Sequence, residues 1–282
     1  MPETSTDRTS FGPAPPDERT TGHYLQEYVE AFVEKWDECI DWDRRAAAES
    51  DLFIRVLHEH GARCVLDVAT GTGFHSIRLV EAGFDVTSAD GSLHMLARAF
   101  ENAKAHDYIL RTIQADWRWL TRDVFSTYDA VICLGNSFPH LFTQHDRRRA
   151  LAEFHAALEH DGVLVLDHRN YDAVLDRSAG AVQWYDYGGR NVEVQPVRID
   201  DELVRIQYRL PDGSTYTLNT CPIRRDETRR LLAEAGFQTI TTHENMSEGR
   251  DAPDFFIHVA EKQYRPNVAP PPESAGERIT QS

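Results

Sequence analysis

Apolar positions along the central part of the chain alternate between strand-like and helix-like spacing. Short apolar runs typical of buried strands occur in CVLDVAT, FDVTSAD, YILRTIQAD, YDAVICLG and GVLVLDH. Between several of them lie FHSIRLVEAG, SLHMLARAFENAKAH and LAEFHAALEH, whose apolar residues are three or four positions apart. This alternation predicts an α/β fold with a parallel, doubly wound sheet.

The region before the first strand has helical spacing with an aromatic face. One N-terminal helix is predicted over residues 23–40, and a second over residues 46–60, ending at Gly61. The apolar face of the first helix consists of Tyr24, Tyr28, Phe32, Trp36 and Cys39.

The pattern changes again after the fifth predicted strand. Period-2 runs separated by GG, DD and PDG turns predict a small antiparallel sheet inserted at residues 181–222. A helix (ETRRLLAEAG) and two late strands (FQTITTHE and PDFFIHVAEK) then complete the main domain. The predicted organisation is a disordered tail (1–20), a lid helix and α/β domain (21–180), the insertion (181–222), the completion of the α/β domain (223–263) and a second disordered tail (264–282).

Composition narrows the classes of partner. The 46 acidic residues outnumber the 30 basic ones, and the net charge of −16 disfavours binding to nucleic acid or to an anionic membrane surface. No apolar run is long enough to span a membrane, and four scattered cysteines without a C-x-x-C pair fit reduced thiols in the cytoplasm. The thirteen histidines show no metal-binding spacing, so no metal site is expected.

The most informative motif is the glycine turn DVATGTG, which follows the first strand. Gly71 and Gly73 allow close approach of a ligand to the backbone, and Asp90, at the end of the next strand, is placed to bind a ribose diol. Ser76 takes the place of the third glycine of G-x-G-x-x-G, which disfavours a dinucleotide and favours S-adenosylmethionine. The alternatives are an ordinary tight turn and a nicotinamide-dependent oxidoreductase.

Two later strand ends have polar residues in apolar surroundings. In ADWRWL, Asp116 is a candidate acceptor for an adenine amine and Trp117 a candidate apolar face, the alternative being a strand end with a buried tryptophan. In CLGNSFPHLF, Asn136, Ser137 and His140 need polar partners, which a ligand or a helix cap would supply.

Two arginines are candidates for binding carboxylates. Arg169, in DHRNYD at the end of the fifth strand, is the candidate anchor for a substrate carboxylate, with an ion pair to Asp167 or Asp172 as the alternative. For Arg45 two roles stay open: binding the carboxylate of the cofactor, or forming a salt bridge on the surface.

Taken together, VLDVATGTG, GFDVTSADGS, ADWRWLTRD, LGNSFPHL, DHRNYD and DFFIHVAEK resemble the glycine N-methyltransferase family, and are most similar to its glycine/sarcosine N-methyltransferases of glycine betaine synthesis. The resemblance covers about residues 23–262. It implies a Rossmann-like class I methyltransferase fold and cytoplasmic, S-adenosylmethionine-dependent methylation of glycine and sarcosine.

The resemblance also implies roles for individual residues. The substrate is expected to be positioned by Asn136, Arg169, Tyr28 and Tyr208. The cofactor is expected to contact Tyr28, Trp36, Arg45, Ala69, Gly71, Asp90, Asp116, Trp117, Leu134 and His140. Tyr24 is the alternative to Tyr28 in the lid.

One segment departs from the animal members of the family. Their tyrosine pair before a proline is replaced here by Thr220 and Cys221 before Pro222, so a tyrosine of the methyl-transfer pocket is absent. A sarcosine/dimethylglycine methyltransferase and a non-catalytic S-adenosylmethionine-binding regulator stay open as alternatives, as does the choice between monomer and homo-oligomer.

Overall fold

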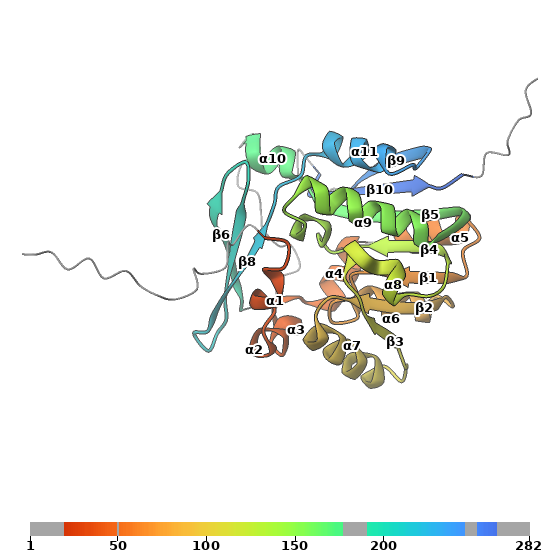
Figure 1. Cartoon of the computed structure of the whole chain (residues 1–282). Helices are drawn as coiled ribbons and strands as arrows, with labels where there is room; N and C mark the ends of the chain where they lie inside the picture. Colours follow the sequence, from red (N-terminus) through yellow and green to blue (C-terminus); the bar gives the residue numbers. More distant parts are fainter. Residues whose placement is uncertain (1–19, 50, 177–190, 246–252, 264–282) are drawn as a thin grey trace, which may run out of the picture.

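A seven-stranded mixed sheet forms the centre of the molecule in the computed structural model, which describes residues 20–49, 51–176, 191–245 and 253–263. Its strand order is β3-β2-β1-β4-β5-β10-β9 (Figure 1). The bounds of these strands are β1 Cys64–Asp67, β2 Asp85–Asp90, β3 Arg111–Gln114, β4 Tyr128–Cys133, β5 Leu158–Arg169, β9 Thr239–Asn245 and β10 Phe255–Glu261.

Strands β1 to β5 are parallel, as the alternation predicted. The last two strands are different, because β10 pairs antiparallel with both β5 and β9. The sequence pattern had left the direction of these two late strands open. Only residues 246–254 connect β9 to β10, fewer than the roughly dozen residues that a parallel crossover requires.

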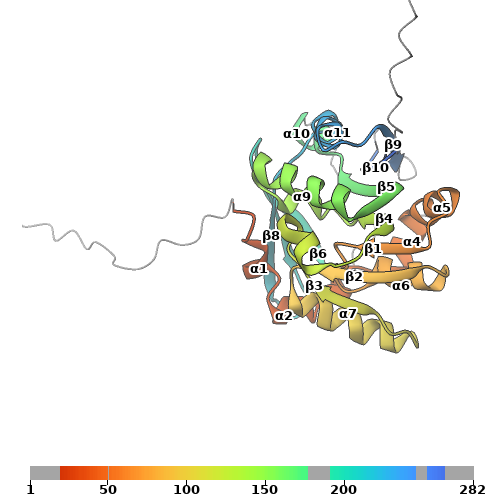
Figure 2. The ribbon, with the colours of Figure 1, turned by 45° about the vertical axis from the view of Figure 1, so that its right-hand side comes forward.

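Helices cover both faces of the sheet. Helices α5 (Leu52–Glu59) and α6 (Phe74–Glu81) pack on one face, and α9 (Gln144–Ala157) and α11 (Arg225–Glu234) on the other (Figure 2). Side chains such as Leu57 and Leu79 on the first face, and Leu151 and Leu231 on the second, are fully buried. The remaining elements of this domain are α7 Leu93–Ala105, η1 Trp117–Trp119, α8 Leu120–Asp123, η2 Phe138–His140 and α10 Tyr171–Asp176.

A separate three-stranded antiparallel sheet stands beside the main domain. It consists of β6 (Glu193–Ile199), β7 (Val204–Arg209) and β8 (Thr215–Thr220), in that order. This confirms the predicted antiparallel sheet, although residues 181–190 of the predicted insertion lie outside the described residues. The N-terminal helices lie against the small sheet (Figure 1), and α1 contacts β8.

The N-terminal region contains three short helices where one continuous helix was predicted. They are α1 (Tyr24–Glu27), α2 (Glu30–Val33) and α3 (Trp36–Cys39), and the breaks fall at Tyr28 and Val29, which leave helical geometry, and at residues 34–35. The segment between the breaks is held by aromatic packing: Phe32 stacks on Tyr216 of the small sheet with ring centroids 4.4 Å apart. Such tertiary packing outweighs helical propensity in segments this short.

The second predicted helix is also divided, into α4 (Trp42–Glu49) and α5. It begins before residue 46, and α5 starts afresh at Leu52, after Asp51, whose backbone is not helical. The two predicted tails fall almost entirely in residues 1–19 and 264–282, outside the described part of the chain. The domain boundaries stay predictions.

Candidate active site

A cavity of about 930 Å³, including its open mouth, lies at the carboxyl edge of the parallel strands. All ten residues predicted to contact the cofactor line it: Tyr28, Trp36, Arg45, Ala69, Gly71, Asp90, Asp116, Trp117, Leu134 and His140. They come from the N-terminal helices and from the ends of four strands. Carboxyl ends of parallel strands meet at one edge of an open sheet, which is where ligands bind in such folds.

The glycine turn and Asp90 form one wall. Gly71 and Gly73 both have positive φ, of 53° and 101°, which glycine adopts without strain. The Asp90 carboxylate accepts hydrogen bonds from the main-chain nitrogens of Gly71 at 2.9 Å and Ser92 at 2.8 Å. Burial raises the pKa of Asp90 to about 6, although these backbone N–H groups oppose the rise. The turn thus fixes the position of a carboxylate that lines the cavity.

A second buried acid, Asp67 at the end of β1, stabilises this turn. It accepts from the Ala69 main-chain nitrogen at 3.1 Å and from the Ser76 hydroxyl at 2.7 Å. Ser76 in turn accepts from Ser88 at 2.8 Å. Burial raises the pKa of Asp67 to about 7. Ser76, at the position of the missing third glycine, therefore has a structural role in positioning the acid before the turn.

Asp116 and Trp117 lie at the end of the cavity beyond β3. Trp117 Nε1 donates to the Val68 carbonyl at 2.6 Å, which orients the indole. Asp116 caps η1 and forms an ion pair with Arg118 at 2.6 Å. The strand-end alternative for this motif is thus compatible with the geometry, and both side chains also face the cavity.

Arg45 takes part in a buried charge cluster and also reaches the cavity. Its Nε atom donates to Glu49 at 2.5 Å, and His75 Nε2 lies 2.8 Å from the other oxygen of Glu49. Burial opposes ionisation of Glu49, but the charges of Arg45 and His75 outweigh it and lower the pKa of Glu49 to about 2. Arg45 thus forms a largely buried ion pair, not one on the surface, and this pair holds its positive charge at the edge of the cavity.

Aromatic side chains of the N-terminal helices cover the cavity. Tyr28 packs edge-on against Trp36, with ring centroids 5.5 Å apart, and its hydroxyl lies 3.3 Å from His140 Nε2. Tyr24 lines the same cavity, so both candidate lid tyrosines are present. Asp37 anchors this cover by accepting from Thr72 Oγ1 of the glycine turn at 2.7 Å.

Of the four residues predicted to position the substrate, only Tyr28 lines the cavity. The other three, Asn136, Arg169 and Tyr208, are not part of its lining. Asn136 has a left-handed backbone (φ 60°) and sits between Gly135 and Ser137, which do line it. Its side chain donates to the Tyr171 hydroxyl at 3.0 Å and accepts from the Arg169 main-chain nitrogen at 2.9 Å. Neither Asn136 nor Ser137 caps a helix with its side chain.

Arg169 and Tyr208 are almost completely buried. The Arg169 guanidinium lies 5.0 Å from the centre of the Phe255 ring, and Asp172, one of its candidate ion-pair partners, pairs with Arg224. Tyr208 packs against Trp36 with ring centroids 5.7 Å apart. The roles assigned to these residues stay predictions.

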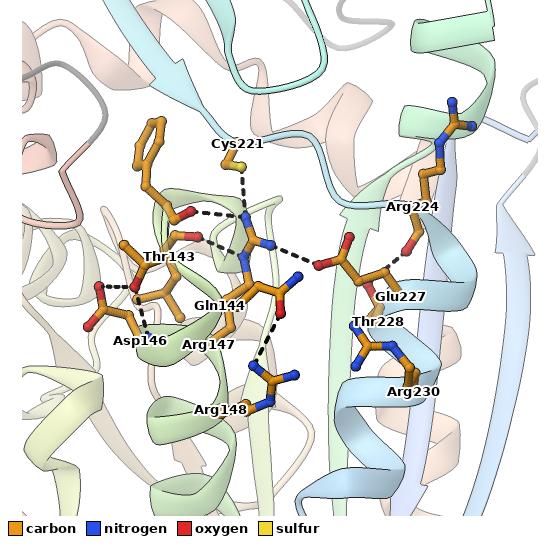
Figure 3. Close-up of polar contacts among 12 residues, drawn as sticks. Thr143, Gln144, Asp146, Arg147, Arg148, Cys221, Arg224, Glu227, Thr228 and Arg230 are labelled. Carbon is orange, nitrogen blue, oxygen red and sulfur yellow. Dashed lines mark hydrogen bonds and ion pairs between the residues drawn. The ribbon is translucent and has the colours of Figure 1, made fainter.

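The segment that replaces the tyrosine pair is anchored to α9 and α11. Arg147 is buried and donates to Cys221 Sγ at 2.7 Å and to Glu227 at 3.0 Å (Figure 3). The Thr220 hydroxyl accepts from Tyr171 at 3.0 Å. Both replacing side chains are thus satisfied by the protein, and burial raises the pKa of the Cys221 thiol.

Other lining residues were not assigned a role from the sequence. They are Thr21, Thr70, Thr72, Phe74, His75, Gly91, Met95, Ala115, Arg118, Gly135 and Leu141, whereas Ser137, which was expected to need a polar partner, lines the cavity as well. Several directly follow strand ends, which is the signal that could have identified them; Met95 and His75 lie on helices and carry no such signal.

Within the described ranges, no group of His, Cys, Asp and Glu side chains is arranged to hold a metal ion. Nor does any described helix have the length and apolar character that crossing a bilayer requires.

Comparison with known proteins gives consistent results. Residues 65–162 match the model of a methyltransferase domain. The chain is 57% identical over 263 residues to the glycine/sarcosine N-methyltransferase of Halorhodospira halochloris, covering 93% of this chain and 98% of the relative. It is 53% identical to the glycine/sarcosine/dimethylglycine N-methyltransferase of Actinopolyspora halophila, covering 92% of this chain and 46% of that longer protein. Rabbit glycine N-methyltransferase is 41% identical over 150 residues, about half of each chain.

Solved structures give the same fold at low sequence identity. An S-adenosylmethionine-dependent methyltransferase from Clostridium acetobutylicum superposes with a TM-score of 0.65 at 17% identity, covering 83% of this chain and 98% of the other. An amino pentose methyltransferase from Micromonospora echinaspora, solved with S-adenosylmethionine bound, superposes with a TM-score of 0.54 at 23% identity, covering 84% and 98%.

Proposed function

The chain belongs to the glycine/sarcosine N-methyltransferase family, and we propose that it transfers methyl groups from S-adenosylmethionine to glycine and then to sarcosine, giving sarcosine and dimethylglycine. It has the Rossmann-like fold of class I methyltransferases, with a small antiparallel sheet added, as predicted. The products fit a place in glycine betaine synthesis.

The observation that carries the proposal is the convergence of the ten predicted cofactor residues on one cavity. They offer a fixed carboxylate for a ribose diol (Asp90), a cation for a carboxylate (Arg45) and aromatic faces for a base and a sulfonium (Trp117 and Trp36). Such a set fits an adenosine group joined to an amino acid, and it offers no cluster of cations for a pyrophosphate.

When bound, S-adenosylmethionine supplies an electrophilic methyl group, which a neutral amine attacks in line with the carbon–sulfur bond. The chain's main task is to hold the two reactants aligned, which can contribute roughly 7–11 kcal/mol in favourable cases. Arg169 and Asn136 would hold the carboxylate of the amino acid, leaving its nitrogen directed at the methyl group. Tyr28 and Trp36 would cover the reacting centre and exclude water.

Aromatic rings also fit the charge of the reactants. A cation against an aromatic face gains roughly 0.5–2 kcal/mol. Tyr28 and Trp36 pack against each other on the cavity, and the buried Tyr208 packs against Trp36 outside the lining. This group would favour the sulfonium before transfer and a methylated ammonium after it.

The substrate set is tested by incubating the protein and S-adenosylmethionine with glycine, sarcosine or dimethylglycine in turn and weighing the products. We expect turnover of glycine and sarcosine, and Asp90→Asn serves as the matched control with weakened cofactor binding. Betaine formed from dimethylglycine would favour the wider activity named for the Actinopolyspora relative. Cofactor binding without product from any of the three would favour the regulator. Cytoplasmic location and oligomeric state stay predictions.

A further inference from the structure

Two buried histidines meet between β5 and β10, next to the predicted substrate residue Arg169. His168 and His258 are fully buried, and their Nε2 atoms lie 3.1 Å apart. Burial lowers the pKa of both imidazoles, to about 4 for His168, so both rings are neutral near pH 7. A neutral imidazole has one N–H donor and one bare nitrogen, so its neighbours decide which nitrogen has the proton.

The main-chain oxygen of Arg169 decides the tautomer of His168. It lies 2.8 Å from His168 Nδ1 and can only accept, so Nδ1 has the proton and Nε2 is bare. His258 Nε2 faces this bare nitrogen and must be the donor. His258 Nδ1 is then the acceptor for the Thr242 hydroxyl, at 3.0 Å.

Flanking side chains agree with this assignment. Arg229 donates to Thr242 Oγ1 at 2.8 Å, so the proton of that hydroxyl is available for His258. Thr228 Oγ1 also lies 3.0 Å from His168 Nε2, and it has the Arg224 carbonyl at 3.3 Å as an alternative acceptor. Donation therefore runs in one direction, from Arg229 through Thr242, His258 and His168 to the carbonyl of Arg169.

The other side of Arg169 is held as well. Its main-chain nitrogen donates to Asn136 Oδ1 at 2.9 Å, and the Asn136 main-chain nitrogen donates to Asp167 at 2.7 Å. Arg169 is the last residue of β5, where pairing with β10 through Phe255 ends. Side chains of His168 and Asn136 thus bind the main-chain oxygen and nitrogen of Arg169, at the end of β5.

We propose that His168 and His258 are positioning residues that fix the backbone of Arg169 and thereby aim its guanidinium at the substrate carboxylate. Stability alone is a poor reason for the pair, because apolar side chains of similar size fill such a space without the cost of burying polar groups. The inference rests on the proposed function, since it takes Arg169 as the carboxylate anchor.

Three variants of the full-length protein test the proposal. His258→Leu removes the donor to His168, whereas His258→Gln keeps an N–H donor near the position of Nε2. Val259→Ala is the matched control, because this buried neighbour on β10 points to the opposite face and leaves a cavity without touching the histidines. For each protein we would measure the KM for glycine, kcat, the Kd for S-adenosylmethionine and the melting temperature.

We expect His258→Leu to raise the KM for glycine by about tenfold or more, because small misplacements of a positioning group have effects of this size. Its Kd for S-adenosylmethionine should stay unchanged, and His258→Gln should restore most of the loss. Val259→Ala should lower the melting temperature without moving the KM. An unchanged KM in His258→Leu, or an equal rise in Val259→Ala, would overturn the proposal.

A spectroscopic measurement separates this inference from the proposed function. Long-range ¹⁵N–¹H spectra of histidine-labelled protein should show His168 protonated at Nδ1 and His258 at Nε2, whether or not the protein turns over. The opposite tautomers would overturn the inference alone. A wild-type protein that methylates neither glycine nor sarcosine would instead overturn the proposed function, and with it the role of Arg169.

Discussion

Gly91, directly after Asp90, leaves the space that Tyr24 occupies above the cavity. A Cβ atom at this position would lie 2.8 Å from Tyr24 Cζ and nearer still to the tyrosine hydroxyl. The backbone of Gly91 is not in the left-handed region, so alanine is accepted there without backbone strain. Gly91→Ala therefore acts through its clash with Tyr24.

The effect of Gly91→Ala on cofactor binding depends on whether Tyr24 or the backbone at residue 91 moves to relieve the clash. Tyr24 lies on the four-residue helix α1, whereas Gly91 follows a strand inside the main sheet. The tyrosine should therefore leave its place, and the sheet should not. Overpacking of this kind costs about 1–3 kcal/mol. If this free energy destabilises the closed position of the N-terminal helices over the cavity, the Kd for S-adenosylmethionine rises by about 5–150-fold.

Calorimetric titration with S-adenosylmethionine is the assay, applied to Gly91→Ala, Tyr24→Ala and the double variant. Because both substitutions remove the same contact, the double variant should bind about as well as Tyr24→Ala alone. Gly22→Ala is the control, since a Cβ there meets no atom within 4 Å. Normal binding by Gly91→Ala, or a double variant as weak as the sum of both losses, would refute the reasoning.

Three further substitutions have distinct expected signatures. Arg169→Gln should raise the KM for glycine by orders of magnitude and leave the Kd for S-adenosylmethionine unchanged, because one partner of a buried charge pair is typically worth several kcal/mol; equal loss of both ligands in calorimetry would make Arg169 structural. Burial raises the pKa of Asp90 to about 6, so its carboxylate is ionised only above that pH, and wild-type affinity for S-adenosylmethionine should fall as the pH drops below 6. Asp90→Asn should bind weakly with a flat profile, and a wild-type profile equally flat from pH 5 to 8 would contradict this. Thr72→Val removes only the hydroxyl that donates to Asp37, which also accepts from Arg98 and Asn102, and should weaken S-adenosylmethionine binding about tenfold, the equivalent of one charged hydrogen bond; unchanged affinity would show that the cover closes without this contact.

The cofactor side of the cavity could be predicted because it is built from strand ends. Asp90, Asp116 and Leu134 each follow an apolar run, and parallel strands bring such positions to one edge whatever the details of packing. At this edge, the sequence pattern around each strand end and the arrangement of the sheet lead to the same residues. The parallel direction of β1 to β5 then follows from the alternation with helices.

Other features depend on packing that periodicity does not encode. The helical spacing of Tyr28 and Trp36 predicted one helix, but the helix is divided, and these rings pack against each other while Trp36 also packs against Tyr208 of the small sheet. The direction of the Asn136 side chain could not be predicted either, because it depends on a left-handed backbone. His258 meets His168 only through the antiparallel pairing of β10 with β5, whose direction the sequence pattern does not encode.

A single-turnover reaction shows whether this chain methylates glycine with S-adenosylmethionine. Excess protein is mixed with glycine and S-adenosylmethionine labelled with deuterium in its methyl group, and the products are analysed by mass spectrometry. We expect sarcosine carrying the intact labelled methyl group, formed together with S-adenosylhomocysteine. S-adenosylmethionine recovered unchanged from the bound complex, with glycine unmethylated, would contradict it.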